Sequence, residues 1–293
     1  MIKKIILGGK SVILVKSIKE LRTQVELWKN EGKSIGFVPT MGYLHEGHGS
    51  LISKAKSQND KVIVSIFVNP TQFGPNEDLD KYPRTLERDV QIMQDLSNKI
   101  IVYAPEVADI YEGNTVSENF NYDGLENQME GKHRPGHFDG VGTIVKRLFE
   151  IVQPNKAYFG EKDFQQLQIV KKLVSKHNIP VEVIGCPIHR EANGLAMSSR
   201  NERLSESARE KAAVIYQILN TAKDFFQSHS AEETTTFVEK EFEKHPEFQL
   251  EYFEIADEAT LLPVSEKESN KKYRGFIAIF IENIRLIDNI SLN

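Results

Sequence analysis

Apolar runs of strand length alternate with amphipathic helical stretches along the first two thirds of the chain. Short apolar runs, several rich in β-branched residues, predict strands at 35–38, 62–68, 100–103, 157–159 and 181–184. Between them, apolar residues at helical spacing predict helices at 17–30, 48–57, 85–96, 140–151 and 164–177. This order is typical of an α/β fold: a Rossmann-like parallel sheet with helices on both faces, whose ligands bind at the carboxyl ends of the strands.

The pattern changes after Cys186. Helices are predicted at 205–228 and 231–244. They are followed by predicted strands at 251–255, 275–281 and 285–287, which we expect to be antiparallel. A chain of 293 residues is longer than one small domain. We therefore expect a Rossmann-like domain over 1–186 and a smaller C-terminal α+β domain over 187–293 that acts as a lid.

Charge and composition limit the classes of protein to which this chain can belong. The net charge is −5 and no long run of Lys or Arg is present, which argues against nucleic acid as the main partner. No apolar stretch reaches the ~20 residues that a membrane-spanning helix needs, and the apolar start at 1–7 is too short for a signal peptide. We expect a cytoplasmic protein in which Cys186 is reduced.

The first candidate site follows the strand at 35–38, where the chain reads Pro-Thr-Met-Gly-Tyr-Leu-His-Glu-Gly-His over 39–48. A strand that turns into a helix presents unpaired N–H groups and partial positive charge, to which phosphates bind. His45 and His48 are three residues apart and can donate to phosphate oxygens, and Gly47 allows close approach to the backbone. Two unrelated surface histidines or a metal site are alternatives, but the single Cys and the lack of other zinc patterns disfavour a dedicated zinc site.

Three further candidates also follow predicted strands. Gln72 lies in a long loop after the strand at 62–68, and its amide suits a substrate with hydroxyl and carboxylate groups. Lys162 stands before a helix that Asp163 could cap, which places an ammonium beside another anion site. The segment Ser198–Arg200 offers two hydroxyls and a guanidinium to a phosphate. Each of the three, taken alone, also fits an ordinary solvated loop.

Five sequence blocks occur together in one order: PTMGYLHEGH at 39–48, FVNPTQF at 67–73, GKHRPGHF at 131–138, FGEKD at 159–163 and GLAMSSRN at 194–201. Together they resemble the pantothenate synthetase (pantoate–β-alanine ligase) family of the HxGH nucleotidyltransferase superfamily. The resemblance implies an ATP-dependent ligase that joins pantoate to β-alanine through a pantoyl adenylate and releases AMP and pyrophosphate. It also implies a requirement for Mg²⁺ and a homodimer.

The resemblance further implies roles for individual residues. The catalytic group would be His45, His48, Lys162 and Arg200. The ATP site would comprise Met41, Gly42, His45, Gly47, His48, Gly160, Glu161, Lys162, Asp163, His189, Met197, Ser198, Ser199 and Arg200. The pantoate and β-alanine site would comprise Met41, Asn69, Gln72 and Gln166, and Asp89 would be associated with Mg²⁺. Two positions depart from the family pattern: His189 replaces a more usual aliphatic residue, and Gly49 replaces a larger one.

The chemistry fits these residue types. Attack of a carboxylate on the α-phosphorus of ATP develops charge on the phosphates, which fixed cationic and N–H donors and a Mg²⁺ ion can meet, so no protein nucleophile is required. Closure of a second domain would shield the adenylate from water. Another HxGH nucleotidyltransferase, or a nucleotide sensor without activity, is the alternative interpretation. ATP turnover that depends on both pantoate and β-alanine distinguishes the three.

Overall fold

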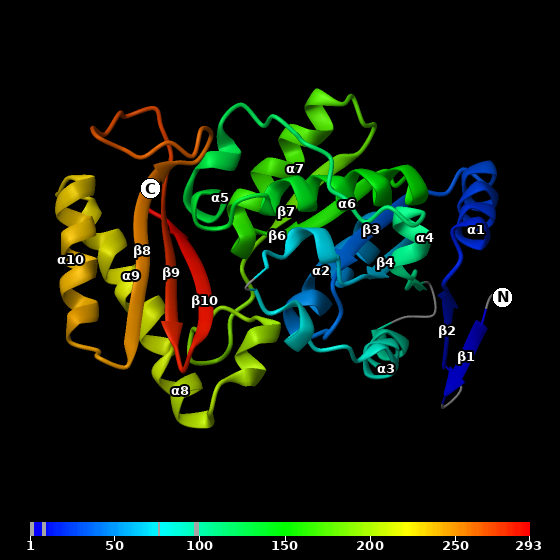
Figure 1. The fold of residues 1–293 in the computed structure, drawn as a ribbon, viewed down its shortest axis with the longest axis horizontal. Helices are drawn as coiled ribbons and strands as arrows, with labels where there is room; N and C mark the ends of the chain where they lie inside the picture. Colours follow the sequence, from blue (N-terminus) through cyan, green and yellow to red (C-terminus); the bar gives the residue numbers. More distant parts are fainter. Residues whose placement is uncertain (1–2, 8–9, 76, 97–99) are drawn as a thin grey trace. The chain divides into compact units, whose positions relative to one another are not determined.

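The computed structural model describes residues 3–7, 10–75, 77–96 and 100–293 (Figure 1). The chain divides into two compact units. Unit 1 comprises Met1–Tyr122, Arg134–Gly160 and Ile169–Cys186, and unit 2 comprises Asp123–His133, Glu161–Gln168 and Pro187–Asn293. The change of unit after Cys186 coincides with the expected boundary, whereas the segments 123–133 and 161–168 belong to unit 2 rather than to the first domain.

In the described part of the chain, unit 1 is built on a seven-stranded sheet of order β1-β2-β5-β4-β3-β6-β7. The strands are β1 (Lys3–Leu7), β2 (Lys10–Val15), β3 (Ile35–Thr40), β4 (Lys61–Ile66), β5 (Ile100–Tyr103), β6 (Lys156–Gly160) and β7 (Glu182–Cys186). β1 pairs with β2 in antiparallel fashion, and all other neighbours are parallel. The sheet grows outward in both directions from the β3/β6 pair, so its topological switch point lies there.

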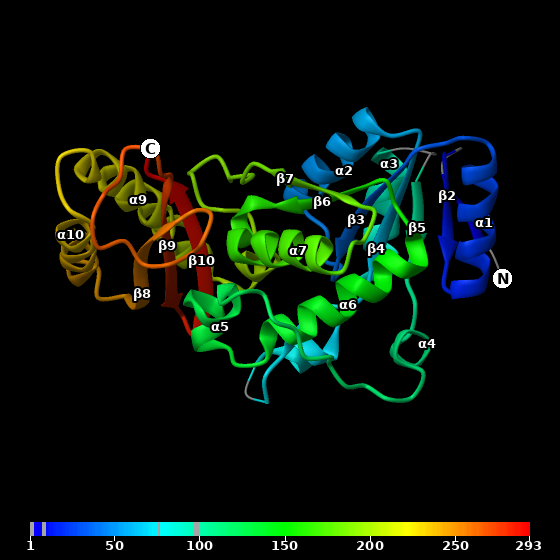
Figure 2. The same cartoon turned by 90° about the horizontal axis from the view of Figure 1, so that it is seen from above.

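Helices cover both faces of this sheet (Figure 2). On one face, α2 (Glu46–Gln58) and α3 (Leu86–Leu96) contribute Ile52 and Met93 to a core with strand residues such as Val64. On the other face, Phe149 of α6 (His137–Val152) packs edge-on against Phe37 of β3, and α1 (Ile18–Asn30) contacts α6. The remaining helical segments between β4 and β7 are α4 (Val107–Tyr111), α5 (Met129–His133), α7 (Phe164–Lys176), and the 3₁₀ turns η1 (Pro70–Gln72), η2 (Leu79–Lys81), η3 (Leu125–Asn127) and η4 (Glu161–Asp163).

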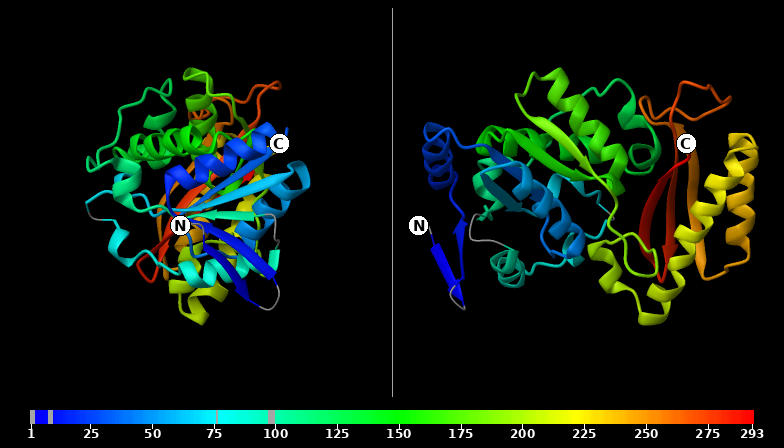
Figure 3. Two further views of the ribbon diagram at one scale, coloured as in Figure 1. Left: turned by 90° about the vertical axis from the view of Figure 1, so that its right-hand side faces the viewer. Right: turned by 180° about the vertical axis from the view of Figure 1, so that it is seen from behind.

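Unit 2 contains an antiparallel sheet of order β10-β9-β8, formed by β8 (Phe248–Asp257), β9 (Tyr273–Ile281) and β10 (Ile284–Ser291). Helices α9 (Ala213–Phe226) and α10 (Ala231–Glu243) pack against one face of this sheet (Figure 3). They follow the turn η5 (Ser199–Arg203) and helix α8 (Glu206–Lys211). The single helix expected over 205–228 is therefore two helices that meet at Ala212.

The expected fold class is confirmed: a Rossmann-like parallel sheet with helices on both faces, and a smaller C-terminal α+β part. Among the residues that the structure describes, no helix is both long enough and apolar enough to span a membrane.

Candidate active site

Two histidines build the start of helix α2. Nδ1 of His45, the N-cap, accepts a hydrogen bond from the Gly47 backbone N–H at 3.1 Å. In return, Nδ1 of His48 accepts from the His45 N–H at 3.3 Å, which completes a reciprocal capping box. Because both Nδ1 atoms act as acceptors, the neutral rings carry their hydrogen on Nε2. Both Nε2 atoms are therefore set as donors beside a helix N-terminus, where phosphate oxygens are stabilised.

Asp89 of α3 fixes the turn that precedes these histidines. Its Oδ2 accepts from the Tyr43 N–H at 2.9 Å and its Oδ1 accepts from the Leu44 N–H at 2.7 Å. Oδ2 also accepts from the Thr85 hydroxyl at 3.3 Å. The turn needs this support because Gly42 and Tyr43 have φ values of +84° and +52°, a conformation that is costly for Tyr.

The surroundings of Asp89 favour a positioning role over the expected magnesium role. The residue is 0% exposed, and both carboxylate oxygens already accept hydrogen bonds from the turn or from Thr85. A Mg²⁺ ligand needs a carboxylate oxygen that can face the ion and its water shell. We therefore assign Asp89 to positioning of the His-x-Gly-His turn.

Replacing Asp89 with Asn tests this assignment. An amide has one oxygen, so one of the N–H groups of Tyr43 and Leu44 would face an NH₂ group and lose its partner, at a cost of ~1–3 kcal/mol. We expect the free energy of unfolding to fall by about that amount and the adenylation rate to fall ~10-fold, with no change in the Mg²⁺ concentration for half-maximal rate. Glu87→Gln, at an exposed position of the same helix, is the control. A marked rise in the Mg²⁺ requirement of Asp89→Asn would restore the metal role.

Three of the residues expected to bind pantoate or β-alanine lie together in unit 1. Asn69 Nδ2 donates to Gln72 Oε1 at 3.1 Å, and Gln72 Nε2 lies 3.3 Å from Met41 Sδ. Asn69 is almost fully buried, and its Oδ1 accepts a 2.5 Å hydrogen bond from the Tyr111 hydroxyl. Burial raises the pKa of Tyr111, which keeps its hydroxyl protonated as a donor. Nothing in the sequence pattern around Tyr111 indicates this contact, because its partner lies 42 positions away.

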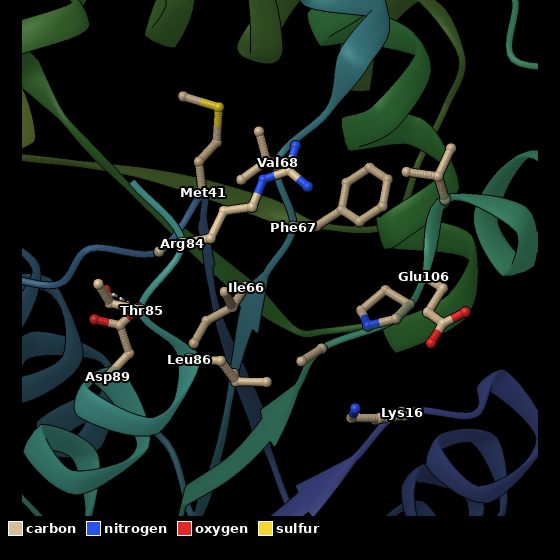
Figure 4. A pocket seen from close by; sticks show the side chains of 14 residues that line it. Lys16, Met41, Ile66, Phe67, Val68, Arg84, Thr85, Leu86, Asp89 and Glu106 are labelled. Atoms are coloured by element: carbon tan, nitrogen blue, oxygen red, sulfur yellow. Dashed lines mark hydrogen bonds between the residues drawn. The ribbon is translucent and has the colours of Figure 1, made fainter. Parts of the chain in front are cut away.

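A cavity of about 360 Å³ lies at the carboxyl ends of β2, β3, β4 and β5 (Figure 4). Met41 and Arg84 lie on one side of it, and Lys16 and Glu106 lie on the other. Ile66 and other apolar side chains line its interior. An apolar cavity with a few charged groups at this edge of an α/β sheet has the composition of a small-molecule site.

In unit 2, the turn η4 carries Glu161, Lys162 and Asp163. Asn289 of β10 holds it, since its side-chain Nδ2 donates to the carbonyls of Glu161 and Lys162 at 2.9 Å each. The Lys162 side chain is 18% exposed, and its Nζ lies 3.7 Å from Asp163 Oδ2. Gln166 is half-buried in the first turn of α7.

The segment around Ser198 is also held within unit 2. The Ser198 hydroxyl caps η5 by accepting from the Arg200 N–H at 3.3 Å. The Met197 N–H donates to the His189 carbonyl at 3.0 Å, so two of the expected ATP residues are neighbours in the backbone network. Ser199 is buried. The Ser198–Arg200 backbone is therefore an ordered turn, which fixes the point from which the Arg200 side chain extends.

A family model described as pantoate-beta-alanine ligase matches residues 13–291. The chain belongs to this family. It is 61% identical over 281 residues to a pantothenate synthetase of Flavobacterium psychrophilum, covering 96% of this chain and 100% of that protein. It is 48% identical over 281 residues to a pantothenate synthetase of Aquifex aeolicus, covering 94% of this chain and 98% of that one.

Solved structures of the pantoate–β-alanine ligase family share the fold over nearly the whole chain. Pantothenate synthetase from Thermus thermophilus is 42% identical with a TM-score of 0.87, covering 95% of this chain and 99% of that one. Pantoate-beta-alanine ligase from Francisella tularensis, solved in complex with beta-gamma ATP and beta-alanine, is 38% identical with a TM-score of 0.77, covering 95% and 97%.

The ligase residues expected from the sequence are divided between the two units. Unit 1 contains Met41, Gly42, His45, Gly47, His48, Asn69, Gln72, Asp89 and Gly160. Unit 2 contains Glu161, Lys162, Asp163, Gln166, His189, Met197, Ser198, Ser199 and Arg200. Within unit 1 the structure brings together the two histidines, and also Met41, Asn69 and Gln72.

Proposed function

We propose that this chain joins pantoate to β-alanine at the expense of ATP, through a pantoyl adenylate, and releases AMP and pyrophosphate. The observation that carries the proposal is the match to the pantoate-beta-alanine ligase model over residues 13–291, which spans both units. The retained His-x-Gly-His turn supports it, because its two imidazoles are already set as Nε2 donors at a helix N-terminus.

In the proposed adenylation step, the pantoate carboxylate attacks the α-phosphorus of ATP and pyrophosphate leaves. The developing charge on the phosphates is met by the Nε2–H groups of His45 and His48, by the Lys162 ammonium and by the Arg200 guanidinium. We propose that the remaining ATP contacts come from Met41, Gly42, Gly47, Gly160, Glu161, Asp163, His189 and Met197–Ser199. Mg²⁺ bound to the phosphates would neutralise part of their charge. We assign it no ligand at Asp89, whose oxygens hold the turn.

Pantoate itself carries a carboxylate and hydroxyl groups, and amide side chains can pair with both. We propose that Gln72 and Gln166 bind these groups, with Asn69 holding the Gln72 amide and Met41 supplying an apolar wall. In the second step, the unprotonated amine of β-alanine attacks the pantoyl carbonyl and AMP leaves. No protein side chain has to form a covalent bond in either step.

We also infer that the protein acts in the cytoplasm as a homodimer. Cys186 is a buried free thiol, which suits a reducing compartment. The homodimer follows from the family resemblance, and sedimentation equilibrium of the purified chain measures it directly.

The decisive experiment is a product assay with purified protein, ATP, Mg²⁺, pantoate and β-alanine. We expect AMP, pyrophosphate and pantothenate in equal amounts, and no net AMP release when pantoate or β-alanine is omitted. A nucleotidyltransferase of another specificity would instead leave the nucleotidyl group in its product. A nucleotide sensor would bind ATP without turnover. Either result would overturn the proposal.

A further inference from the structure

The sequence block 131–138 enters unit 1 at Arg134, and none of its residues has a role in the steps above. Arg134 meets Glu77 through a two-pronged contact: Nε donates to Oε1 and Nη2 donates to Oε2, both at 2.7 Å. The two side chains are 19% and 25% exposed. A guanidinium and a carboxylate in this parallel arrangement fix each other's orientation as well as their distance. The contact therefore ties the segment after η1 to the turn that precedes α6.

His137 extends this contact to Gln72. It is the first residue of α6 and is almost fully buried. Its Nδ1 lies 2.8 Å from the Gln72 carbonyl oxygen, and its Nε2 lies 3.2 Å from Arg134 Nη1. A carbonyl can only accept, so Nδ1 carries the hydrogen, and the neutral ring is left with Nε2 as the acceptor for Arg134. One tautomer satisfies the whole series from Glu77 to Gln72.

The Gln72 side chain is held separately. Its Oε1 accepts from Asn69 and its Nε2 points to Met41 Sδ, as described above. The His137 contact therefore controls the backbone of Gln72, while Asn69 controls its amide. Positioning to within a fraction of an ångström matters for a group that binds a reacting substrate.

We propose that Glu77, Arg134 and His137 are positioning residues that hold the Gln72 backbone and thereby set the affinity of the site for its hydroxy-acid substrate. The proposal rests on the proposed function of Gln72 in binding pantoate. The arrangement predicts a selective defect: loss of any member should weaken binding of the acid more than binding of ATP, because none of the groups proposed to bind the phosphates belongs to this series.

Substitutions of His137 give the sharpest test. In His137→Asn, the amide nitrogen can take the place of Nδ1 and still donate to the Gln72 carbonyl, whereas in His137→Gln the amide is placed near Nε2 and that donor is lost. We expect His137→Gln to raise KM for pantoate ~10-fold, with KM for ATP within about twofold of wild type. We expect His137→Asn to recover most of the pantoate affinity.

Two variants test the ion pair between Arg134 and Glu77. Arg134→Lys keeps the positive charge but cannot form two parallel hydrogen bonds with the carboxylate, and Glu77→Gln removes the negative charge with little change of shape. Both should raise KM for pantoate by ~5–10-fold, and their effects should be less than additive in the double variant because each breaks the same contact. Glu118→Gln is the matched control, since it removes the 2.7 Å ion pair between Lys146 of α6 and Glu118 in the same unit. Its KM for pantoate should not change.

Three outcomes would overturn the proposal: lower thermal stability with unchanged KM for pantoate, equal losses for pantoate and ATP, or identical behaviour of His137→Asn and His137→Gln. If the wild-type protein does not consume ATP with pantoate at all, the proposed function itself has failed. In that case the hydroxy acid that the protein does activate takes the place of pantoate, and the same KM comparison decides the positioning role.

Discussion

Replacing His48 or Lys162 with Ala is expected to lower the single-turnover rate of pantoyl adenylate formation by ~10²–10³-fold, the usual effect of losing one preorganised transition-state donor. The physical reason is the same for both. Each variant loses a donor that is set before the substrate binds, His48 at the start of α2 and Lys162 in a turn that Asn289 holds. Rapid-quench measurement of the adenylate gives the rate.

His48 has two functions that a substitution by Ala removes together, because its Nδ1 also completes the helix cap. His48→Asn keeps an acceptor near Nδ1 and loses the Nε2 donor, so it should fold with near-normal stability and form the adenylate as slowly as His48→Ala. His48→Gln keeps a donor near Nε2 and loses the cap acceptor, so it should retain part of the rate with a free energy of unfolding lower by ~1 kcal/mol. Near-normal adenylation in both His48→Ala and Lys162→Ala would refute the assignment of the phosphate site.

Gly140→Ala is expected to damage the proposed pantoate site by displacing the η1 turn, against which α6 packs. An added Cβ at Gly140 would lie 2.3 Å from the Thr71 carbonyl oxygen and 2.6 Å from Gln72 Cα. These neighbours are backbone atoms and cannot rotate away, so the turn or α6 must shift. We expect the free energy of unfolding to fall by ~1–3 kcal/mol and KM for pantoate to rise at least ~10-fold, with ATP binding much less affected.

Gly49→Ala is the control for this effect. Gly49 lies inside α2, and a Cβ there would meet no atom within 4 Å. Alanine is the better helix former by ~1 kcal/mol, so the variant should be as stable as wild type or slightly more stable, with unchanged kinetics. The departure from the family pattern at this position would then have no consequence for activity. An unchanged KM for pantoate in Gly140→Ala would show that the position of the η1 turn does not matter for substrate binding.

The central strands could be predicted because buried parallel strands are short, continuous apolar runs, as in Val62–Ile66. The edge strand β1 and its neighbour β2 were not predicted. Short apolar runs at 5–7 and 12–15 precede the first helix, but the parallel partner of β2 is distant in the sequence: Ile13 pairs with Ile101 of β5, 88 positions away. A run that short acquires its structure from the strand beside it, which a sequence pattern does not contain.

Contacts between residues distant in the sequence also limited what could be predicted of the candidate site. Residue types and spacing could predict the strand-to-helix turn at His45 and His48, because a helix start has a local sequence signature. They could not predict that Asp89 holds this turn or that Arg134 pairs with Glu77, since those partners are 45 and 57 positions apart. The same reason separates the magnesium role expected for Asp89 from the positioning role that we assign to it: an acid in a helix looks alike in the sequence whether its oxygens are available or already bonded.

The interleaved course of the chain limits how such enzymes can be recombined. Unit 2 takes segments from the first 186 residues, and one of them carries Glu130, which binds Arg285 of β10 through two hydrogen bonds of 2.7 and 2.8 Å. A hybrid gene joined at Cys186 would therefore combine the Glu130 of one parent with the Arg285 of another. Such a cassette exchange can succeed only between parents that agree at both positions, so inheritance of the C-terminal part is coupled to a segment more than 50 residues upstream of the junction.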